Sequence, residues 1–212
     1  TKIANKTVIM KIICIGRNYI DHAKELNNPV PEKPVFFMKP DTSLLRNNQP
    51  FFLPDFSSDV HYEVEVILRI NRVGKNIEKQ FAHRYYSDIG LGIDFTARDL
   101  QRECKEQGLP WEVAKGFDGS AVIGSILKME TFGDILSLDF SLQKNGETVQ
   151  QGNTSNMIFS FDDIITYVSK FLTLKIGDLI FTGTPAGVGP VQIGDKLEGF
   201  IGKKQMFTCE IK

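Results

Sequence analysis

Two carboxylates separated by one residue stand in the run His61–Leu68, which otherwise has the composition of a β-strand. Alternate residues of a strand point to the same face, about 6.6 to 7 Å apart, so Glu63 and Glu65 are expected to share a face. At that spacing two anionic carboxylates repel each other by roughly 2.5 kcal/mol when the effective dielectric constant is near 20. Either water solvates this face, or a divalent cation such as Mg²⁺ or Ca²⁺ binds the carboxylate oxygens.

A third acid favours the cation. Asp94 ends an apolar, glycine-containing strand directly before a predicted helix, where an acid can also serve only to flank the helix. Three carboxylates around Mg²⁺ leave one net negative charge and open positions for water or a substrate, whereas Ca²⁺ usually takes more protein ligands.

His61 shares the face of the glutamates. A Zn²⁺ or Mn²⁺ site with one imidazole is therefore an alternative, as is a histidine that caps the strand or supports a ligand.

A candidate acid–base pair lies upstream, in a predicted short helix over residues 18–26. His22 and Glu25 are three residues apart, so their side chains can meet on one face of that helix. A carboxylate beside an imidazole orients the ring and raises its basicity, as a general base requires. The alternative is a surface helix of mixed charge, since Asp21 and Lys24 are also present.

Two glycine-bearing segments offer further functional groups. Lys115 lies in residues 111–120, which show neither helical nor strand periodicity. Its ammonium group could hold a carboxylate or stabilise an enolate. The alternative is a solvated surface lysine. Residues 182–190 follow an apolar strand and offer backbone N–H groups and two hydroxyls, but they lack the Gly-Lys-Ser/Thr ending of a P-loop. Arg17 could form a bidentate pair with a substrate carboxylate.

The predicted elements are mainly strands, which indicates a β-rich α+β domain. Strands are predicted at Ile12–Ile15, Val35–Met38, Val64–Ile70, Ile89–Phe95, Leu136–Gln143, Leu179–Thr182 and Gln205–Ile211. The sequence Asn145-Gly146 predicts a type I′ hairpin turn. Besides residues 18–26, helices are predicted at 97–107, closed by Gly108, and at 160–172, which opens like a capping box.

Composition limits the classes of function. The 212 residues are 42% hydrophobic and 24% charged with a net charge of −1, which fits one compact domain and argues against binding to nucleic acid or an anionic membrane. No apolar run approaches the ~20 residues of a membrane span, and the first residues lack the features of a signal peptide. Three widely spaced cysteines, at 14, 104 and 209, argue against a disulfide framework and favour a reducing, cytoplasmic location.

Several motifs together resemble those of the fumarylacetoacetate hydrolase family, and its short single-domain acylpyruvases and oxaloacetate decarboxylases most of all. They are GRNYIDHAKE, FFMKP, HYEVEV, GIDFTARDLQ, AKGFDGSA and FTGTPAGVG, in this order. The resemblance covers residues 11–212 and leaves residues 1–10 as an N-terminal extension, or as a start at Met10. It is far more specific than a Glu-x-Glu pair alone.

The resemblance implies a mixed β-roll, a homodimer and a site for Mg²⁺ or Mn²⁺. In this family pattern the metal ligands match Glu63, Glu65 and Asp94. The acid–base pair, carried on a helix that closes over the substrate, matches His22 and Glu25. The active-site lysine matches Lys115, and residues that contact or border the substrate match Arg17, Gln101 and Thr184.

Residues and resemblance together predict a metal-dependent enzyme for small 2-oxo acids. A cation that binds the carboxylate and 2-oxo group would stabilise the enolate formed when the C3–C4 bond of an acylpyruvate breaks, with water activated by His22 and Glu25. We therefore expect a hydrolase that cleaves acylpyruvate-type 2,4-dioxo acids to pyruvate and a carboxylic acid, and decarboxylation of oxaloacetate at the same site. The alternatives are a tautomerase or isomerase of 2-oxo acids, acting on oxaloacetate or a hydroxy-dienedioate, and a non-catalytic cation-binding β domain.

Overall fold

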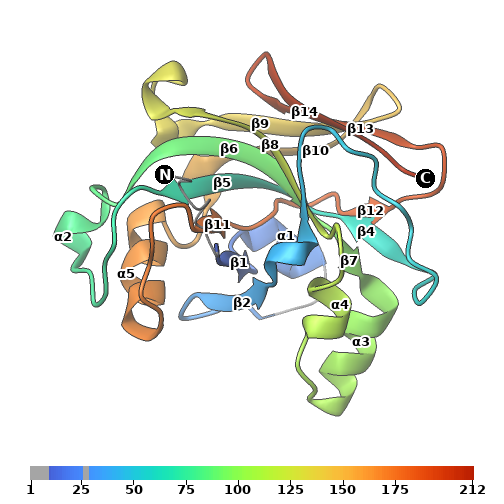
Figure 1. Ribbon diagram of the computed structural model, residues 1–212, viewed down its shortest axis with the longest axis horizontal. Coiled ribbons are helices and arrows are strands. Elements are labelled where there is room, and N and C mark those ends of the chain that lie inside the picture. Colours follow the sequence, from blue (N-terminus) through green and yellow to red (C-terminus); the bar gives the residue numbers. More distant parts are fainter. Residues whose placement is uncertain (1–9, 26–28) are drawn as a thin grey trace, which may run out of the picture.

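The computed structural model describes residues 10–25 and 29–212 and forms three β-sheets with few helices, as the sequence predicts (Figure 1). The strands are β1 (Ile12–Gly16), β2 (Val35–Lys39), β3 (Leu44–Leu45), β4 (Val60–Tyr62), β5 (Val64–Ile70), β6 (Tyr86–Asp94), β7 (Thr96–Ala97), β8 (Ala121–Lys128), β9 (Asp139–Lys144), β10 (Glu147–Asn153), β11 (Leu179–Phe181), β12 (Gly189–Pro190), β13 (Lys196–Ile201) and β14 (Lys204–Glu210). The α-helices are α1 (Ile20–Glu25), α2 (Lys79–Ala82), α3 (Arg98–Gln107), α4 (Glu112–Lys115) and α5 (Phe161–Phe171), and the 3₁₀ turns are η1 (Asp41–Ser43), η2 (Met129–Thr131), η3 (Ile135–Ser137) and η4 (Thr154–Asn156).

A seven-stranded sheet forms the main layer, in the order β2-β1-β11-β5-β6-β8-β3. Its β1–β11 and β3–β8 pairs are parallel and its other pairs antiparallel, so the sheet is mixed. A four-stranded sheet, β10-β9-β13-β14, lies over it in Figure 1, with α2 and α5 at one end of the molecule and α3 and α4 at the other.

The main core fills the space between these two sheets. Alternate residues of β5, namely Val64, Val66 and Leu68, are fully buried in it, as the period of a strand requires. The second sheet contributes Phe140, Leu142, Leu197 and Phe207 to the same cluster. Glu65 lies between Val64 and Val66 and therefore points to the opposite face of β5, away from this core.

The third sheet, β12-β4-β7, creates the break at which the acidic residues lie. Glu63 separates β4 from β5, and Phe95 separates β6 from β7. Across this break the backbone N–H of Asp94 donates to the carbonyl oxygen of Glu63 at 2.9 Å, and the N–H of Phe95 donates to Ser120 O at 2.8 Å. The three predicted ligands therefore come together where two neighbouring strands leave one sheet for another.

Three predicted helices and the predicted hairpin are confirmed. The α5 helix begins with a capping box between Ser160 and Asp163, and α3 ends at Gly108, whose φ of 67° is left-handed. Helix α1 is shorter than predicted at its start, and Leu26, its predicted last residue, lies outside the described residues. Asn145 and Gly146 have φ angles of 54° and 85°, as a type I′ turn requires.

Two local predictions are wrong. The strand predicted from Leu136 begins only at Asp139, because residues 135–137 form a 3₁₀ turn that is capped by the Asp134 carboxylate accepting from the N–H of Leu136 at 2.9 Å. The segment around Lys115 is not irregular, since residues 112–115 form the single turn of α4. The sequence analysis did not predict β8, β13 or the short strands β3, β7 and β12.

The three cysteines are buried and free. The sequence analysis likewise argues against a disulfide framework. No helix in the described part of the chain combines the length and apolar character needed to span a membrane. The predicted extension at residues 1–10 lies outside the described residues, except for Met10.

Candidate active site

One cavity collects eight of the nine residues that the sequence singles out. It is lined by Arg17, His22, Glu63, Glu65, Asp94, Gln101, Lys115 and Thr184, together with Ile15, Gly16, Phe37, Arg98, Lys105 and Trp111. The ninth residue, Glu25, contacts His22 instead of lining the cavity. These residues come from β1, α1, the β4–β5 break, β6, α3, α4 and the loop after β11, so the site exists only in the folded chain.

The three acidic residues form a compact, buried cluster. Glu63, Glu65 and Asp94 are 5%, 2% and 1% exposed, and each offers an oxygen so placed that all three oxygens lie within 4.8 Å of one another. This burial excludes the reading of Glu63 and Glu65 as a solvated strand face. Buried carboxylates need compensation by cations, metal ions or protons, because a lone buried charge is strongly destabilised.

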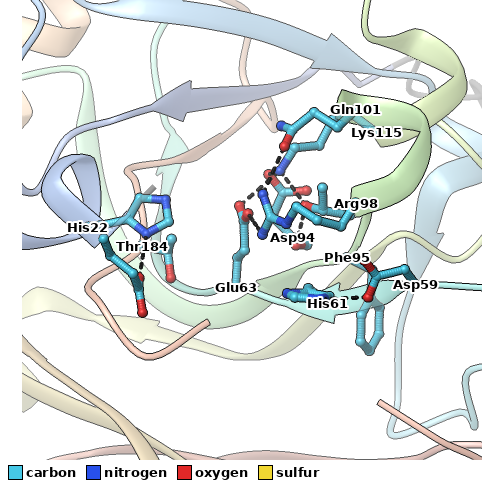
Figure 2. Close-up of polar contacts among 12 residues, drawn as sticks. His22, Asp59, His61, Glu63, Asp94, Phe95, Arg98, Gln101, Lys115 and Thr184 are labelled. Atoms are coloured by element: carbon cyan, nitrogen blue, oxygen red, sulfur yellow. Dashed lines mark hydrogen bonds and ion pairs between the residues drawn. The ribbon is translucent and has the colours of Figure 1, made fainter. Parts of the chain in front are cut away.

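Lys115 compensates two of these carboxylates directly. Its Nζ lies 2.8 Å from Glu63 Oε2, 2.8 Å from Asp94 Oδ2 and 2.5 Å from Thr96 Oγ1, and the ammonium group is buried (Figure 2). Burial alone would lower the pKa of Lys115, but the charges of Asp94 and Glu63 outweigh it and raise the pKa. All three donors of the ammonium group thus have partners within the site. A contact between Lys115 and a substrate enolate stays a prediction.

Two more cations complete the charge balance, and the sequence analysis missed both. Arg98 Nη2 donates to Glu63 Oε1 at 2.6 Å, and Lys39 Nζ lies 2.7 Å from Asp94 Oδ1. Lys39 is 2% exposed and also donates to the carbonyl oxygens of Phe95 and Ser120, at 3.2 and 2.9 Å. Both cations stand in motifs that carry the family resemblance. The need to compensate three buried acids is the physical signal that could have identified them.

The two glutamates differ in their affinity for a proton. Burial by itself would raise the pKa of Glu63, but the charges of Lys115 and Arg98 bring it far below its ordinary value. Burial, together with the charges of Asp94 and Glu63, raises the pKa of Glu65 well above its ordinary value. Glu65 therefore tends to keep a proton unless a further cation is present.

The arrangement fits a divalent metal ion. Glu65 accepts one hydrogen bond, from the N–H of Gly183 to Oε2 at 2.7 Å, and within the described residues its Oε1 has no hydrogen-bond partner. Glu63 and Asp94 also have lone pairs to spare beyond their contacts with Lys115, Arg98 and Lys39. An all-carboxylate donor set suits hard cations such as Mg²⁺ and Mn²⁺. Glu63, Glu65 and Asp94 would hold such an ion.

His61 takes no part in this cluster. Its Nε2 lies 2.8 Å from Asp59 Oδ1, and Figure 2 shows the ring turned toward Asp59. Burial and the charge of Arg98 lower the pKa of His61 against the opposing effect of Asp59. The alternative of a metal site with one imidazole ligand thus finds no support in the geometry.

The predicted pair of His22 and Glu25 is formed at one side of the cavity. His22 (Figure 2) has its Nδ1 3.2 Å from Glu25 Oε2. The N–H of Gly187 donates to Glu25 Oε1 at 3.0 Å. His22 is 5% exposed, so the ring is shielded from water on most of its surface. When Nδ1 carries a proton and donates it to Glu25, Nε2 is left with a lone pair that can accept a proton.

A glycine and an asparagine fix the loop that follows β11. Gly183 has a φ of 106°, and a Cβ there would stand 2.6 Å from Asn18 Cβ, so only glycine allows its N–H to reach Glu65. Asn18, fully buried, donates to Thr182 O at 2.8 Å and to Phe159 O at 3.0 Å. The start of α1 and the loop that carries Thr184 are therefore held as one unit beside the acidic cluster.

Gln150 connects the second sheet to this site. Its Oε1 accepts from the N–H of Val64 at 2.9 Å, and its Nε2 donates to Thr184 Oγ1 at 2.9 Å and to Pro185 O at 3.0 Å. The side chain is 1% exposed. It thereby supplies the hydrogen bond that the β4–β5 break leaves open and positions the hydroxyl of Thr184.

Comparison with known proteins identifies the family. Residues 11–212 match the model of the fumarylacetoacetate (FAA) hydrolase C-terminal domain. The chain belongs to the fumarylacetoacetate hydrolase family. Its fold, predicted as the mixed β-roll of that domain, is confirmed by a solved member: the fumarylpyruvate hydrolase from Pseudomonas aeruginosa, in complex with Mn²⁺ and pyruvate, superposes with a TM-score of 0.90 at 34% identity over 96% of this chain and 89% of that chain.

Curated family members are similar along most of their length. The oxaloacetate tautomerase FAHD1, mitochondrial, of Mus musculus is 44% identical over 190 residues, which are 90% of this chain and 86% of the relative. The oxaloacetate tautomerase YcgM of Escherichia coli K12 is 42% identical over 190 residues, 89% of this chain and 87% of the relative. By name these relatives act on oxaloacetate, a 2-oxo acid, which belongs to the substrate class that the sequence predicts.

The raised pKa of Glu65 predicts a pH-dependent response to metal. The pKa of Glu65 in the folded protein is higher than its ordinary value of about 4.5. Proton binding by Glu65 therefore stabilises the metal-free fold fully below about pH 4.5, and this stabilisation is lost as the pH rises through the raised pKa. We therefore expect the melting temperature in EDTA to fall between pH 5 and pH 8. The increase in melting temperature on adding Mn²⁺ should become larger over the same pH range. Saturation at ~100 times Kd would add about 2.7 kcal/mol of stability.

The variant Glu65→Gln should lose most of this Mn²⁺ gain and its pH dependence, as measured by thermal unfolding with and without Mn²⁺. Glu147→Gln, which removes an exposed carboxylate from the β9–β10 hairpin, is the control and should behave like the wild type. An unchanged Mn²⁺ response in Glu65→Gln contradicts the assignment of Glu65 as a ligand.

Replacement of Gln150 should destabilise the fold and the site together. Gln150→Leu leaves the N–H of Val64 and the oxygen of Pro185 without their partners, and one unsatisfied buried group costs about 1–3 kcal/mol. Urea denaturation should show this loss, whereas Gln151→Leu, at the exposed neighbouring position, should change stability by no more than about 0.5 kcal/mol. Equal stabilities of the two variants contradict the role given to Gln150.

Proposed function

We propose that the protein is a divalent-metal-dependent oxaloacetate tautomerase, which interconverts the enol and keto forms of that 2-oxo acid. The observation that carries the proposal is a single cavity in which the buried cluster of Glu63, Glu65 and Asp94 lies together with His22, the ring paired with Glu25. The names of the mouse and E. coli relatives support oxaloacetate as the substrate.

Charge supports an anionic substrate. Glu63, Glu65 and Asp94 are balanced by Lys39, Arg98 and Lys115, so a divalent ion gives this cluster an excess of two positive charges, to which Arg17 and Lys105 of the same cavity add. Because these charges are buried, an anion of two negative charges is attracted strongly to the cavity. Oxaloacetate carries two carboxylates at neutral pH and meets this condition.

The bound metal ion, Mg²⁺ or Mn²⁺, would supply Lewis-acid stabilisation for the 2-oxo oxygen, on which negative charge collects as the enol forms. His22 is placed to move the proton. In the direction from keto to enol, Nε2 accepts a proton from C3 while Glu25 stabilises the resulting imidazolium; in the reverse direction the imidazolium returns a proton to C3. Gln101, whose Oε1 accepts from Arg98 Nη1 at 2.8 Å, and Thr184 would orient the substrate.

A non-catalytic cation-binding domain explains less. A structural cation needs only its ligands. Here His22 lines the same cavity and is paired with Glu25, and the buried Lys115 contacts two of the proposed ligands. The homodimer and the cytoplasmic location stay predictions of the sequence analysis.

Removal of the base should slow tautomerisation strongly and spare metal binding. We expect His22→Asn to lower kcat for oxaloacetate by about 10²- to 10⁴-fold, the usual contribution of general acid–base catalysis. The assay follows the decay of enol absorbance after oxaloacetate is diluted into buffer with Mg²⁺ or Mn²⁺. His83→Asn, which changes an exposed histidine after α2, is the matched control. Wild-type rates in His22→Asn, with Mn²⁺ affinity unchanged in both variants, rule out His22 as the base.

Cleavage of acylpyruvates is a second candidate function. The structural neighbour from P. aeruginosa is a fumarylpyruvate hydrolase in complex with Mn²⁺ and pyruvate, and its likeness to this chain favours the same site chemistry here. A water molecule activated by His22 would attack the distal carbonyl, and the C3–C4 bond would break to release pyruvate and a carboxylic acid. Decarboxylation of oxaloacetate passes through the same pyruvate enolate without an attacking water.

We expect the wild type to release pyruvate from acetylpyruvate more slowly than it tautomerises oxaloacetate, because hydrolysis needs an ordered water in addition to the proton transfer. Coupling pyruvate to lactate dehydrogenase measures this release, and EDTA should stop it. If kcat/KM for acetylpyruvate exceeds that for oxaloacetate tautomerisation, the hydrolase becomes the main function.

A further inference from the structure

Two cations of the cavity wall are not used by the acidic cluster. Arg98 and Lys115 are paired with Glu63, but within residues 10–25 and 29–212 neither Arg17 nor Lys105 forms an ion pair with a carboxylate, although both line the same cavity. Burial and the positive charges of Arg17 and Arg98 lower the pKa of Lys105. Positive charges close together at a cavity wall repel one another, and a bound anion offsets this repulsion.

The backbone of Arg17 is strained. It has a φ of 59°, a left-handed conformation that costs a residue other than glycine about 1–3 kcal/mol. The conformation is imposed by its neighbours, since β1 ends at Gly16 and the side chain of Asn18 is bonded to Thr182 and Phe159. Such strain persists where the surrounding structure fixes it, and here it leaves Arg17 at the cavity wall.

Lys105 belongs to one face of α3. Arg98, Gln101 and Lys105 follow each other at spacings of three and four residues, so they project from the same side of the helix, and all three line the cavity. The Nζ of Lys105 lies 5.7 Å from the centre of the Trp111 ring, a cation–π contact that orients the lysine. The two other residues of this face are bound to each other, which leaves Lys105 available to a ligand.

We propose that Arg17 and Lys105 form an anion subsite that binds the distal carboxylate of a dicarboxylic 2-oxo acid, and that Lys105 is a specificity-determining residue. The inference rests on the proposed function in one respect, since the 2-oxo end of the substrate is assigned to the acidic cluster and its metal ion. The guanidinium group of Arg17 offers a planar fork that matches a carboxylate, and the ammonium group of Lys105 adds a second charge. A 2-oxo acid with an uncharged tail, such as acetylpyruvate, gains nothing from this subsite.

The first experiment compares two substrates that differ by one charge. Oxaloacetate and its 4-methyl ester are given to the wild type and to Lys105→Met in the presence of Mn²⁺. Because a charge-assisted hydrogen bond is lost, KM for oxaloacetate should rise about 10-fold or more, while kcat stays within about 3-fold and the kinetics of the ester do not change. Arg102→Met, which removes an exposed cation of α3 outside the cavity, should leave both substrates unaffected.

The result is decisive in either direction. A selective loss for oxaloacetate supports the subsite, whereas no loss, or an equal loss for oxaloacetate and its ester, overturns it. The double variant Arg17→Gln/Lys105→Met adds a test of cooperation. Two groups that bind the same carboxylate should give losses that are not additive, and strictly additive losses mean that they do not share a ligand.

A binding measurement separates this inference from the proposed function. Calorimetry on the Mn²⁺-loaded protein compares malate, a 2-hydroxy dicarboxylate, with lactate, which lacks the distal carboxylate. Preference for malate that is lost in Lys105→Met supports the subsite even when the wild type has no tautomerase activity, and in that case the proposed function alone fails. Tautomerase activity without any preference for malate refutes the subsite alone.

Discussion

Three carboxylates held together in the interior of the protein are the constraint on which the site depends. Their mutual repulsion would open the structure unless other charges offset it, and the chain provides a lysine from β2, an arginine from the start of α3 and a lysine from the end of α4. These three elements are separated along the chain. Their packing is thus set by charge balance as well as by the apolar core.

The balance is also what makes a metal ion effective. With all three acids ionised, the three acids and three cations sum to zero, so a bound divalent ion would make the cluster positive and an anionic substrate would offset that charge. The raised pKa of Glu65 indicates that a proton can take the place of the ion. Under the proposed function, metal, proton and substrate are therefore linked through the same three side chains, and each would alter the affinity for the others.

Sequence analysis located the three clustered acids because their types and spacing carry the information. The Glu-x-Glu pair on a strand and Asp94 at a strand end follow from the period of a β-strand, and the pairing of His22 with Glu25 follows from the period of a helix. Lys39 and Arg98 were missed because nothing local distinguishes them from solvated cations; only the folded structure shows that they are buried beside the acids. The motifs that contain them were recognised, but no role was attached to these positions.

Other features could not be derived from local patterns at all. Gln150 lies between Val149 and Gln151 in a mostly polar strand. Its contacts with Val64 and Thr184 join residues that are 86 and 34 positions away in the sequence. The 3₁₀ turn at residues 135–137 depends on one aspartate that competes with the strand for a backbone N–H. The proposed anion subsite likewise joins Arg17, which follows β1, to Lys105 of α3, and these residues line one cavity only in the fold.

The hydrogen bond from Val64 to Gln150 makes one sheet dependent on the other. A designer who transplanted the metal-binding strands into a new scaffold would therefore have to bring part of the β9–β10 hairpin with them. Without it, the N–H of Val64 next to the β4–β5 break would lose its partner. The minimal portable unit of this chemistry is thus larger than the set of groups that touch the reactants.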